Sequence, residues 1–339
     1  MINSILTIVT NRIHSLPVLV LMPHSSCNCR CVMCDIWKAN SQKKEISVEE
    51  LQKHIETFRK LKVREIALSG GEALMHSNLW KFCSLLHQHN IRITLLSTGL
   101  LLKHHASEIL KHIDEVIVSL DGGKDIHNQI RNIPNAYEKL EEGVKILKKM
   151  KPNFPVKGRT VLQKQNFRDF QNIVQSAKTL GLDQISFLGA DVSTEAFNRA
   201  EPWNDKRVSE VALTKEEVVE FRMILAKSFI DFKRDYETRF IAESPIKMMT
   251  IAQHYAGLLG LEEYPKKKCN APWVSAVVES DGEVKPCFFH ASYGNIFQQD
   301  FLSLINSTSA IDFRKELNVK KNPVCQKCVC SLYLSPIKF

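Results

Sequence analysis

Hydrophobic residues in the first two thirds of the chain follow two alternating patterns. Short runs rich in Val, Ile and Leu predict β-strands at residues 17–22, 64–68, 91–96, 115–119, 156–162 and 184–188. Stretches with apolar residues at helical spacing lie between these runs and after the last one, and they predict helices. Strands and helices in this order indicate a parallel sheet with right-handed crossovers.

Residues typical of helix ends mark several of these helices. Ser47 with Glu50, and Thr214 with Glu217, have the spacing of capping boxes. Gly181 has the place of a glycine that follows a helix. The other helices are predicted near residues 78–89 and 100–112, and from residues 135 and 166 onward.

The number of units favours a partial barrel over a closed one. Six strand–helix units are too few for the eight of a complete (β/α) barrel. We therefore predict an α/β fold, a partial (β/α)6 TIM-like barrel over residues 18–238, with an open doubly wound sheet as the alternative. In either fold the functional site would lie at the carboxyl ends of the strands.

The pattern becomes irregular after residue 238. Residues 239–339 contain scattered prolines, a hairpin-like stretch VVESDGEVKPCFF and five cysteines. This composition predicts a small, cysteine-rich C-terminal domain over 239–339, which a bound metal would stabilise. Residues 1–17 are left as an N-terminal segment.

Composition and charge narrow the class of protein. The chain has 339 residues, of which 44% are hydrophobic and 24% charged, as in folded globular proteins. The net charge of +9 is spread along the chain. The apolar N-terminus is interrupted by Asn11, Arg12 and Pro17, so it predicts neither a membrane span nor a signal peptide. We expect a cytoplasmic protein without membrane association, in which close-spaced cysteines are metal ligands or redox groups.

A first cysteine cluster follows the first predicted strand. Within HSSCNCRCVMC, Cys27, Cys31 and Cys34 have the spacing C-x3-C-x2-C. Three thiolates from one loop can hold three irons of a 4Fe–4S cube and leave the fourth iron open for chemistry. A structural zinc site, with His24 or Cys29 as its fourth ligand, is the alternative.

Short polar motifs follow the next three strands. They are Ser69-Gly70-Gly71-Glu72, Ser97-Thr98-Gly99 and Ser119-Leu120-Asp121-Gly122. Each motif alone indicates a turn. Since parallel strands end at one edge of a sheet, however, the three motifs and the cysteine loop are expected to share one rim.

With these motifs, residues 18–190 resemble the radical S-adenosylmethionine (SAM) superfamily. The resemblance implies that Cys27, Cys31 and Cys34 hold a 4Fe–4S cluster whose open iron binds SAM. Met33 stands where that family usually has an aromatic residue near the adenine. The SAM-binding residues that the resemblance implies are Gly70, Gly71, Glu72, Ser97, Ser119 and Asp121.

The resemblance also implies an activity. In this family a reduced cluster cleaves SAM to a 5′-deoxyadenosyl radical, which abstracts hydrogen from a substrate. The implied partners are a reductant such as flavodoxin or ferredoxin and a substrate that is a small biosynthetic intermediate. A peptide substrate, as for enzymes that mature modified peptides, is the alternative. Nucleic acid is not expected as a partner, because the sequence has no RNA-binding motif.

A second cysteine cluster lies in the C-terminal region and resembles the SPASM/twitch extension of the same superfamily. The resemblance implies one auxiliary 4Fe–4S cluster on Cys269, Cys287, Cys325 and Cys328. Cys330 could replace Cys325 or Cys328. A zinc ribbon is the alternative for this cluster, and a non-catalytic zinc or electron-transfer protein is the alternative for the whole chain.

Predictions can also be made for three further residues and one connecting segment. Cys83 lies in a helical apolar pattern and is predicted to be a core thiol. Arg131 and Arg159 are candidate contacts of SAM or substrate. The stretch 190–213 is long for a strand–helix connection, and we expect it to take part in substrate recognition.

Overall fold

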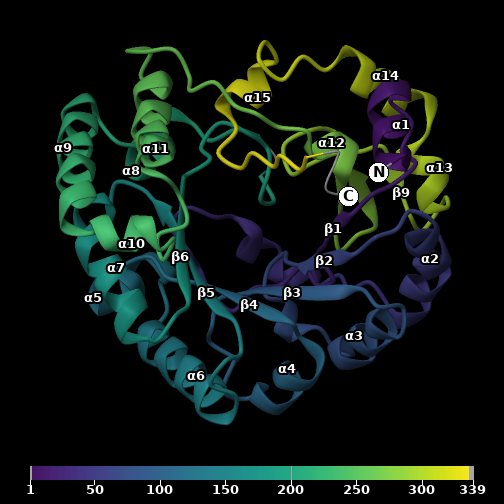
Figure 1. The fold of residues 1–339 in the computed structure, drawn as a ribbon, viewed down its shortest axis with the longest axis horizontal. Coiled ribbons are helices and arrows are strands. Elements are labelled where there is room, and N and C mark those ends of the chain that lie inside the picture. The colour runs from purple at the N-terminus through teal and green to yellow at the C-terminus, as the bar shows by residue number, and fades with distance from the viewer. Residues whose placement is uncertain (1, 200, 336–339) are drawn as a thin grey trace.

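The computed structural model describes residues 2–199 and 201–335, and its centre is a curved sheet of nine strands (Figure 1). The strand order is β6-β5-β4-β3-β2-β1-β7-β8-β9. The strands are β1 Val18–Leu21, β2 Glu65–Leu68, β3 Arg92–Ser97, β4 Glu115–Ser119, β5 Val156–Leu162, β6 Gln184–Gly189, β7 Ser275–Val278, β8 Glu283–Lys285 and β9 Gly294–Asn295.

Helices line the outer side of this sheet and also occur in the C-terminal region. The α-helices are α1 Ile2–Thr10, α2 Val48–Lys60, α3 Leu79–Gln88, α4 Ala106–His112, α5 Lys124–Arg131, α6 Ala136–Met150, α7 Phe170–Thr179, α8 Asp205–Val211, α9 Lys215–Asp231, α10 Lys233–Glu237, α11 Pro245–Leu258, α12 Ala271–Val274, α13 Phe301–Ile305, α14 Thr308–Glu316 and α15 Pro323–Lys327. Short 3-10 helices are η1 Ile36–Gln42, η2 Ala73–Met75 and η3 Phe167–Asp169. Within the described residues, no helix is both long and apolar enough to cross a membrane.

The first six strands form the predicted partial barrel. They pair in parallel and in sequence order from β1 to β6. A doubly wound sheet would reverse its strand order at a switch point and carry helices on both faces. Here helices α2 to α7 lie along the outer side of the curved sheet (Figure 1), so the partial barrel is confirmed and the alternative is wrong.

Side chains alternate between the two faces of these strands. In β5, Val156, Thr160 and Leu162 are fully buried, whereas Arg159 between them is exposed. The register places Arg159 beside Ser119 of β4 on one side and Ser186 of β6 on the other. A polar row therefore crosses the uncovered face of the sheet near its carboxyl rim.

The C-terminal region continues the barrel. Strand β7 pairs in parallel with β1, and β8 returns antiparallel to β7, so the predicted hairpin is confirmed. Helix α11 packs against α9 and β6 at the other end of the sheet. The C-terminal residues thus close over the open side of the barrel from both ends (Figure 1). The domain boundary between residues 238 and 239 stays a prediction.

The predicted helices differ from the observed ones in a few places. The Thr214–Glu217 capping box is complete, but at Ser47 only the side-chain bond to the N–H of Glu50 forms. The helix predicted at 100–112 begins only at Ala106. The residues before Ala106 form turns instead. In these turns Leu102 is fully buried and packs against Gly143, where a Cβ atom would lie 2.6 Å from the Cβ of Leu102.

Candidate functional site

The first cysteine cluster lies on the loop after β1, and hydrogen bonds fix both of its ends. The backbone N–H of Cys27 donates to Asn40 Oδ1 at 2.9 Å, and Asn40 Nδ2 donates back to the Cys27 carbonyl at 2.8 Å. At the other end, Trp37 Nε1 donates to the Cys34 carbonyl at 2.9 Å. The backbone N–H of Ile36 approaches Cys34 Sγ at 3.5 Å.

Helix α5 holds the middle of this loop. The carbonyls of Ile130 and Arg131 accept hydrogen bonds from the N–H groups of Val32 and Arg30, both at 3.1 Å. The Arg131 side chain turns toward the loop and donates from Nη1 to Cys31 Sγ at 3.4 Å. The last turn of α5 therefore supports the predicted cluster ligands through both backbone and side chain.

The thiols of the loop differ in their acidity. The pKa of Cys31 is lowered to about 7, chiefly by a hydrogen bond from the Cys29 thiol and further by the Arg131 guanidinium. Cys29 is buried between Cys27 and Cys31, and its hydrogen bonds to their sulfurs raise its own pKa. Burial raises the pKa of Cys34 to about 12. Cys31 therefore ionises more readily than Cys29 or Cys34 before any metal binds.

The Gly-Gly-Glu motif after β2 packs directly against the cysteine loop. A Cβ on Gly71 would lie 2.1 Å from the Ser26 carbonyl oxygen, so only glycine fits there. The N–H of Glu72 donates to the same carbonyl at 2.9 Å. Gly70 has a φ of +107°, in the left-handed region that favours glycine. The structure therefore brings two of the predicted motifs into contact.

The Glu72 carboxylate is fully buried and organises the rim. It accepts hydrogen bonds from Ser97 Oγ at 3.0 Å, and from the Thr98 N–H and Oγ1 at 2.7 and 2.6 Å. Burial raises the pKa of Glu72, and these hydrogen bonds oppose the shift. Thr98 Oγ1 also lies 3.0 Å from Asn28 Oδ1, and the buried Asn28 Nδ2 has no partner. Predicted residues Glu72 and Ser97 are thus joined, and an unpaired donor lies beside them in the cysteine loop.

The two predicted residues at the end of β4 face different surroundings. Ser119 lies in the polar row beside Arg159. The Asp121 carboxylate is fully buried, pairs with Arg131 Nη2, and accepts a hydrogen bond from the Val161 N–H at 3.0 Å. Asp121 thus supports Arg131 here, and its implied contact with SAM stays a prediction.

The second cysteine cluster comes together around one pocket, although its members span about sixty residues of sequence. The pocket is also lined by Lys267, Phe289 and His290. His290 Nε2 lies 3.3 Å from Cys325 Sγ. Within the described residues, no three His, Cys, Asp or Glu side chains gather as the ligands of a single metal ion would. The cysteines that line this pocket are Cys269, Cys287, Cys325, Cys328 and Cys330.

Asparagine side chains position the segments that carry these cysteines. Asn322 caps the short helix α15 by accepting a hydrogen bond from the Cys325 N–H at 3.1 Å. Asn270, next to Cys269, donates to the Leu334 carbonyl at 2.8 Å and accepts from the Leu334 N–H at 2.9 Å. These bonds hold the tail of the chain beside the first cysteine of the pocket.

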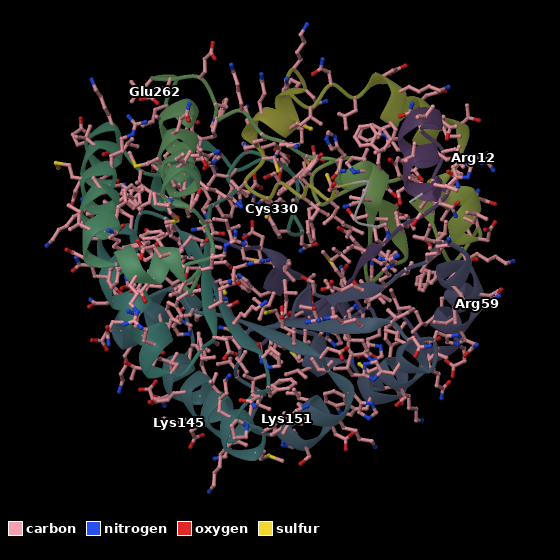
Figure 2. All side chains as sticks on the ribbon, viewed as in Figure 1. Arg12, Arg59, Lys145, Lys151, Glu262 and Cys330 are labelled. Atoms are coloured by element: carbon pink, nitrogen blue, oxygen red, sulfur yellow. The ribbon has the colours of Figure 1, made fainter. Side chains whose placement is uncertain are left out.

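Cys330 differs from the other four cysteines of the pocket. It is the exposed member of the group, and its backbone N–H and carbonyl both contact Cys328 Sγ. In Figure 2 it lies near the middle of the view, while Arg12, Arg59, Lys145 and Glu262 lie at the periphery. Cys83 is fully buried in α3, as predicted for a core thiol.

The long connection after β6 joins the two cysteine regions. Near the first cluster, Trp203 Nε1 donates to Asp35 Oδ2 at 2.8 Å. Near the second, the Phe197 ring stacks on Phe288 with centroids 6.2 Å apart. Inside the connection, Arg199 forms a buried ion pair with Asp191 at 2.7 Å. The described residues of the predicted recognition segment therefore contact both sites, and we call them the bridge.

A cleft of about 730 Å³, including its open mouth, runs beside this bridge. Gly70, Gly71 and His24 line one side, and Phe197 and Phe288 line another. The turn between β7 and β8, residues 279–281, completes it. The cleft thus reaches from the Gly-Gly motif to the neighbour of Cys287.

Sequence reasoning missed four contacts in these sites. It gave no role to His290, which contacts Cys325, or to Asn270 and Asn322. It considered Arg131 only as a contact of SAM or substrate, whereas the structure places it on Cys31. The signal available in the sequence was closeness to a cysteine: His290 follows Cys287 by three positions, and Asn322 precedes Cys325 by three.

Both donor sets fit iron–sulfur clusters. All ten cysteines are free of disulfides, and the three predicted ligands of the first loop project from one short segment. Backbone and guanidinium N–H groups already point at the sulfurs of Cys31 and Cys34, as they do toward bound thiolates. The buried Asn28 amide, which has no partner, leaves a donor beside the loop for a ligand.

Comparison with protein families gives two matches. The sequence model of the radical SAM superfamily matches residues 21–177. The model described as SPASM, an iron–sulfur cluster-binding domain, matches residues 269–329. The two matched segments contain the two predicted ligand sets and stop short of Cys330.

Several characterised proteins are similar over most of their length. An AdoMet-dependent heme synthase of Methanosarcina barkeri is 23% identical over 300 residues, which cover 86% of this chain and 82% of the relative. A cysteine-type anaerobic sulfatase-maturating enzyme of Clostridium novyi is 24% identical over 342 residues, covering 93% and 85%.

Solved structures share the fold. SuiB of Streptococcus suis, bound to the precursor peptide SuiA, has a TM-score of 0.64 at 13% identity, over 97% of this chain and 74% of that one. Native anSMEcpe with bound AdoMet has a TM-score of 0.64 at 21% identity, over 92% of this chain and 86% of that one.

These matches agree with the cysteine geometry described above. The cofactors are a 4Fe–4S cluster with SAM at the barrel and an auxiliary iron–sulfur group in the C-terminal region. The chain therefore contains a radical SAM domain at residues 21–177 and a SPASM iron–sulfur cluster-binding domain at residues 269–329.

Proposed function

We propose that this enzyme abstracts hydrogen from a substrate held between its two cysteine sites. When bound and reduced, the cluster on Cys27, Cys31 and Cys34 supplies the electron that cleaves SAM to a 5′-deoxyadenosyl radical. The observation that carries the proposal is the cleft described above. It has the Gly-Gly motif on one side and Phe288, next to Cys287, on another. A substrate in this cleft would lie near both cofactors.

The residues of the chain would bind, orient and exclude water. Gly70 and Gly71 line the cleft at the rim, where SAM would bind, and Glu72 keeps that rim rigid through its buried hydrogen bonds. In the bridge, Phe197 contacts Phe288 and Trp203 contacts Asp35, so these two side chains would cover the space between the sites. Covering that space would protect a reactive radical from water and side reactions.

For the auxiliary site we propose one 4Fe–4S cluster on Cys269, Cys287, Cys325 and Cys328. Cys330 is exposed, lies beyond the SPASM match and contacts Cys328 rather than the others. On these four cysteines a cluster would supply an acceptor for the electron that the substrate gives up after it loses a hydrogen atom, so that the overall reaction would be a two-electron oxidation. The reductant of the first cluster would be a flavodoxin or ferredoxin in a reducing cytoplasm.

Two substrate classes have support. A small biosynthetic intermediate is the first candidate, since the heme synthase relative aligns over 82% of its own length. A peptide is the second, because the cleft is open along one side and a sulfatase-maturating enzyme aligns over 85% of its length. An open cleft admits one side chain of a longer chain as well as a free small molecule.

The test begins with anaerobically reconstituted protein. We expect about eight irons and eight sulfides per chain, for two 4Fe–4S clusters, and formation of 5′-deoxyadenosine from SAM with a strong reductant. Four irons with bound zinc would contradict the auxiliary assignment, and no 5′-deoxyadenosine would contradict the function. Deuterium-labelled candidate substrates then separate the two classes, because the true substrate transfers deuterium into 5′-deoxyadenosine.

A further inference from the structure

Arg131 is the buried cation that contacts a predicted ligand of the SAM cluster. Its side chain is 7% exposed, and Nη1 donates to Cys31 Sγ at 3.4 Å. Nη2 pairs with the Asp121 carboxylate, which is fully buried. Arg131 is about one hundred residues from Cys31 in sequence, so the contact is made by the fold and not by the loop itself.

The position of the guanidinium is fixed from several directions. The Arg131 carbonyl accepts a hydrogen bond from the Arg30 N–H at 3.1 Å, which anchors the end of α5 to the cysteine loop. Asp121 is itself held by the Val161 N–H at 3.0 Å. Because backbone and side chain are both anchored, the guanidinium has one place, directly against the sulfur.

Among the described side chains, Arg131 is the cation that is hydrogen-bonded to this sulfur. His127, also on α5, is fully buried and accepts a hydrogen bond from the Asp121 N–H through Nδ1 at 3.1 Å. Burial, helped by the Arg131 charge, lowers the pKa of His127 to about 3, so its imidazole is neutral. The side chain of Arg30 is exposed to solvent, which screens its charge.

We propose that Arg131 raises the reduction potential of the SAM cluster by hydrogen bonding to the Cys31 sulfur, and that Asp121 holds the guanidinium in place. The proposal rests on the ligand set proposed above. Reduction adds one negative charge to the cluster, and a cation bonded to a ligand sulfur stabilises the reduced state more than the oxidised state. Arg131 thus acts through Cys31 and makes the first electron transfer easier.

The test is a redox titration of the reconstituted enzyme, followed by electron paramagnetic resonance. The SAM cluster is recognised as the signal that changes when SAM is added. Arg131→Met removes the charge and keeps the volume. Because it leaves Asp121 as an unpaired buried carboxylate, the double variant Arg131→Met/Asp121→Asn is made as well. Arg131→Lys keeps the charge without the planar fork, and Arg30→Met removes an exposed charge from the same loop.

We expect the SAM-responsive signal of the double variant to need a more negative potential. The expected change in its reduction equilibrium is about tenfold, which is about 59 mV for one electron. Arg131→Lys should shift it less, and Arg30→Met should leave it unchanged. The auxiliary signal should stay constant in all four variants.

Two outcomes would overturn the proposal. One is an unchanged potential in a double variant that keeps its full iron content. The other is loss of the first cluster from both the double variant and Arg131→Lys, which would make Arg131 a structural clamp. A different result, no SAM-responsive signal in the unmodified protein, would instead contradict the proposed function.

Discussion

The two cysteine sites of this molecule are built in opposite ways. The first takes Cys27, Cys31 and Cys34 from one eight-residue segment between a sheet strand and a short helix. Backbone hydrogen bonds from α5 and contacts from Gly71 hold that segment. The second collects five cysteines from separate stretches of an irregular region, and the one nearest the end of the chain is exposed.

This difference shows which interactions keep each site ordered. The first loop is shaped by the barrel, so its protein ligands are prearranged before a cluster binds. The second site has few regular elements around it, with strands of two to four residues and a five-residue helix, α15. Such a region gains much of its stability from the group that it binds. Loss of a ligand should therefore affect chemistry at the first site and both chemistry and order at the second.

The largest expected effect is at the first site. Cys31→Ala should abolish formation of 5′-deoxyadenosine, because it removes one of three ligands that no neighbour replaces. The matched control is Cys29→Ala, which removes a buried thiol of the same loop that is not a predicted ligand. It should retain SAM cleavage, measured by the same assay. If Cys29→Ala were inactive and Cys31→Ala active, the assigned ligand set would be wrong.

The next effect separates the roles of the two sites. Cys287→Ala should leave SAM cleavage measurable but stop conversion of substrate, because the first cluster alone supplies the electron for cleavage. Liquid chromatography of 5′-deoxyadenosine and of product measures the two steps separately, and circular dichroism reports folding. A folded variant with full product formation would show that the auxiliary cluster is not required for turnover.

Removal of iron should disorder the second cysteine site much more than the first. Chelation is expected to raise amide hydrogen exchange strongly around residues 320–330, since that segment is held by few regular hydrogen bonds. Exchange in β1 and α5, which flank the first loop, should change little, because the sheet and helix persist without metal. An equal rise in amide hydrogen exchange in both regions would show that the first site depends on its metal for order as much as the second.

The two regions also differ in how much of their structure could be predicted from the sequence. All six barrel strands and the motifs at their ends were predictable, because hydrophobic periodicity and chain order determine a parallel sheet. Helix α5 was missed: only Ile126 and Ile130 give it an apolar pattern. The contact between Arg131 and Cys31 could not be predicted, since it depends on how α5 packs against a loop about one hundred residues earlier. At the second site the resemblance to the SPASM/twitch extension implied a ligand set, which stays a prediction, and no periodic pattern pointed to His290 or Asn270.

The smallest expected effect concerns the anchoring of the tail at the second site. Asn270→Ala removes two side-chain hydrogen bonds to the backbone of Leu334, and leaves the backbone groups of Leu334 to find other partners. Each such bond contributes about 1 kcal/mol, so we expect a loss of about 1–2 kcal/mol in the stability of this region.

Asn78→Ala is the matched control, because Asn78 is exposed and makes no capping bond to α3. The measurement is the rate of iron release to a chelator, followed by absorbance. Asn270→Ala should release the auxiliary iron faster while the SAM-responsive signal stays intact, and Asn78→Ala should behave as the unmodified protein. Equal release from the two variants would mean that bonds other than those of Asn270 hold the tail beside Cys269.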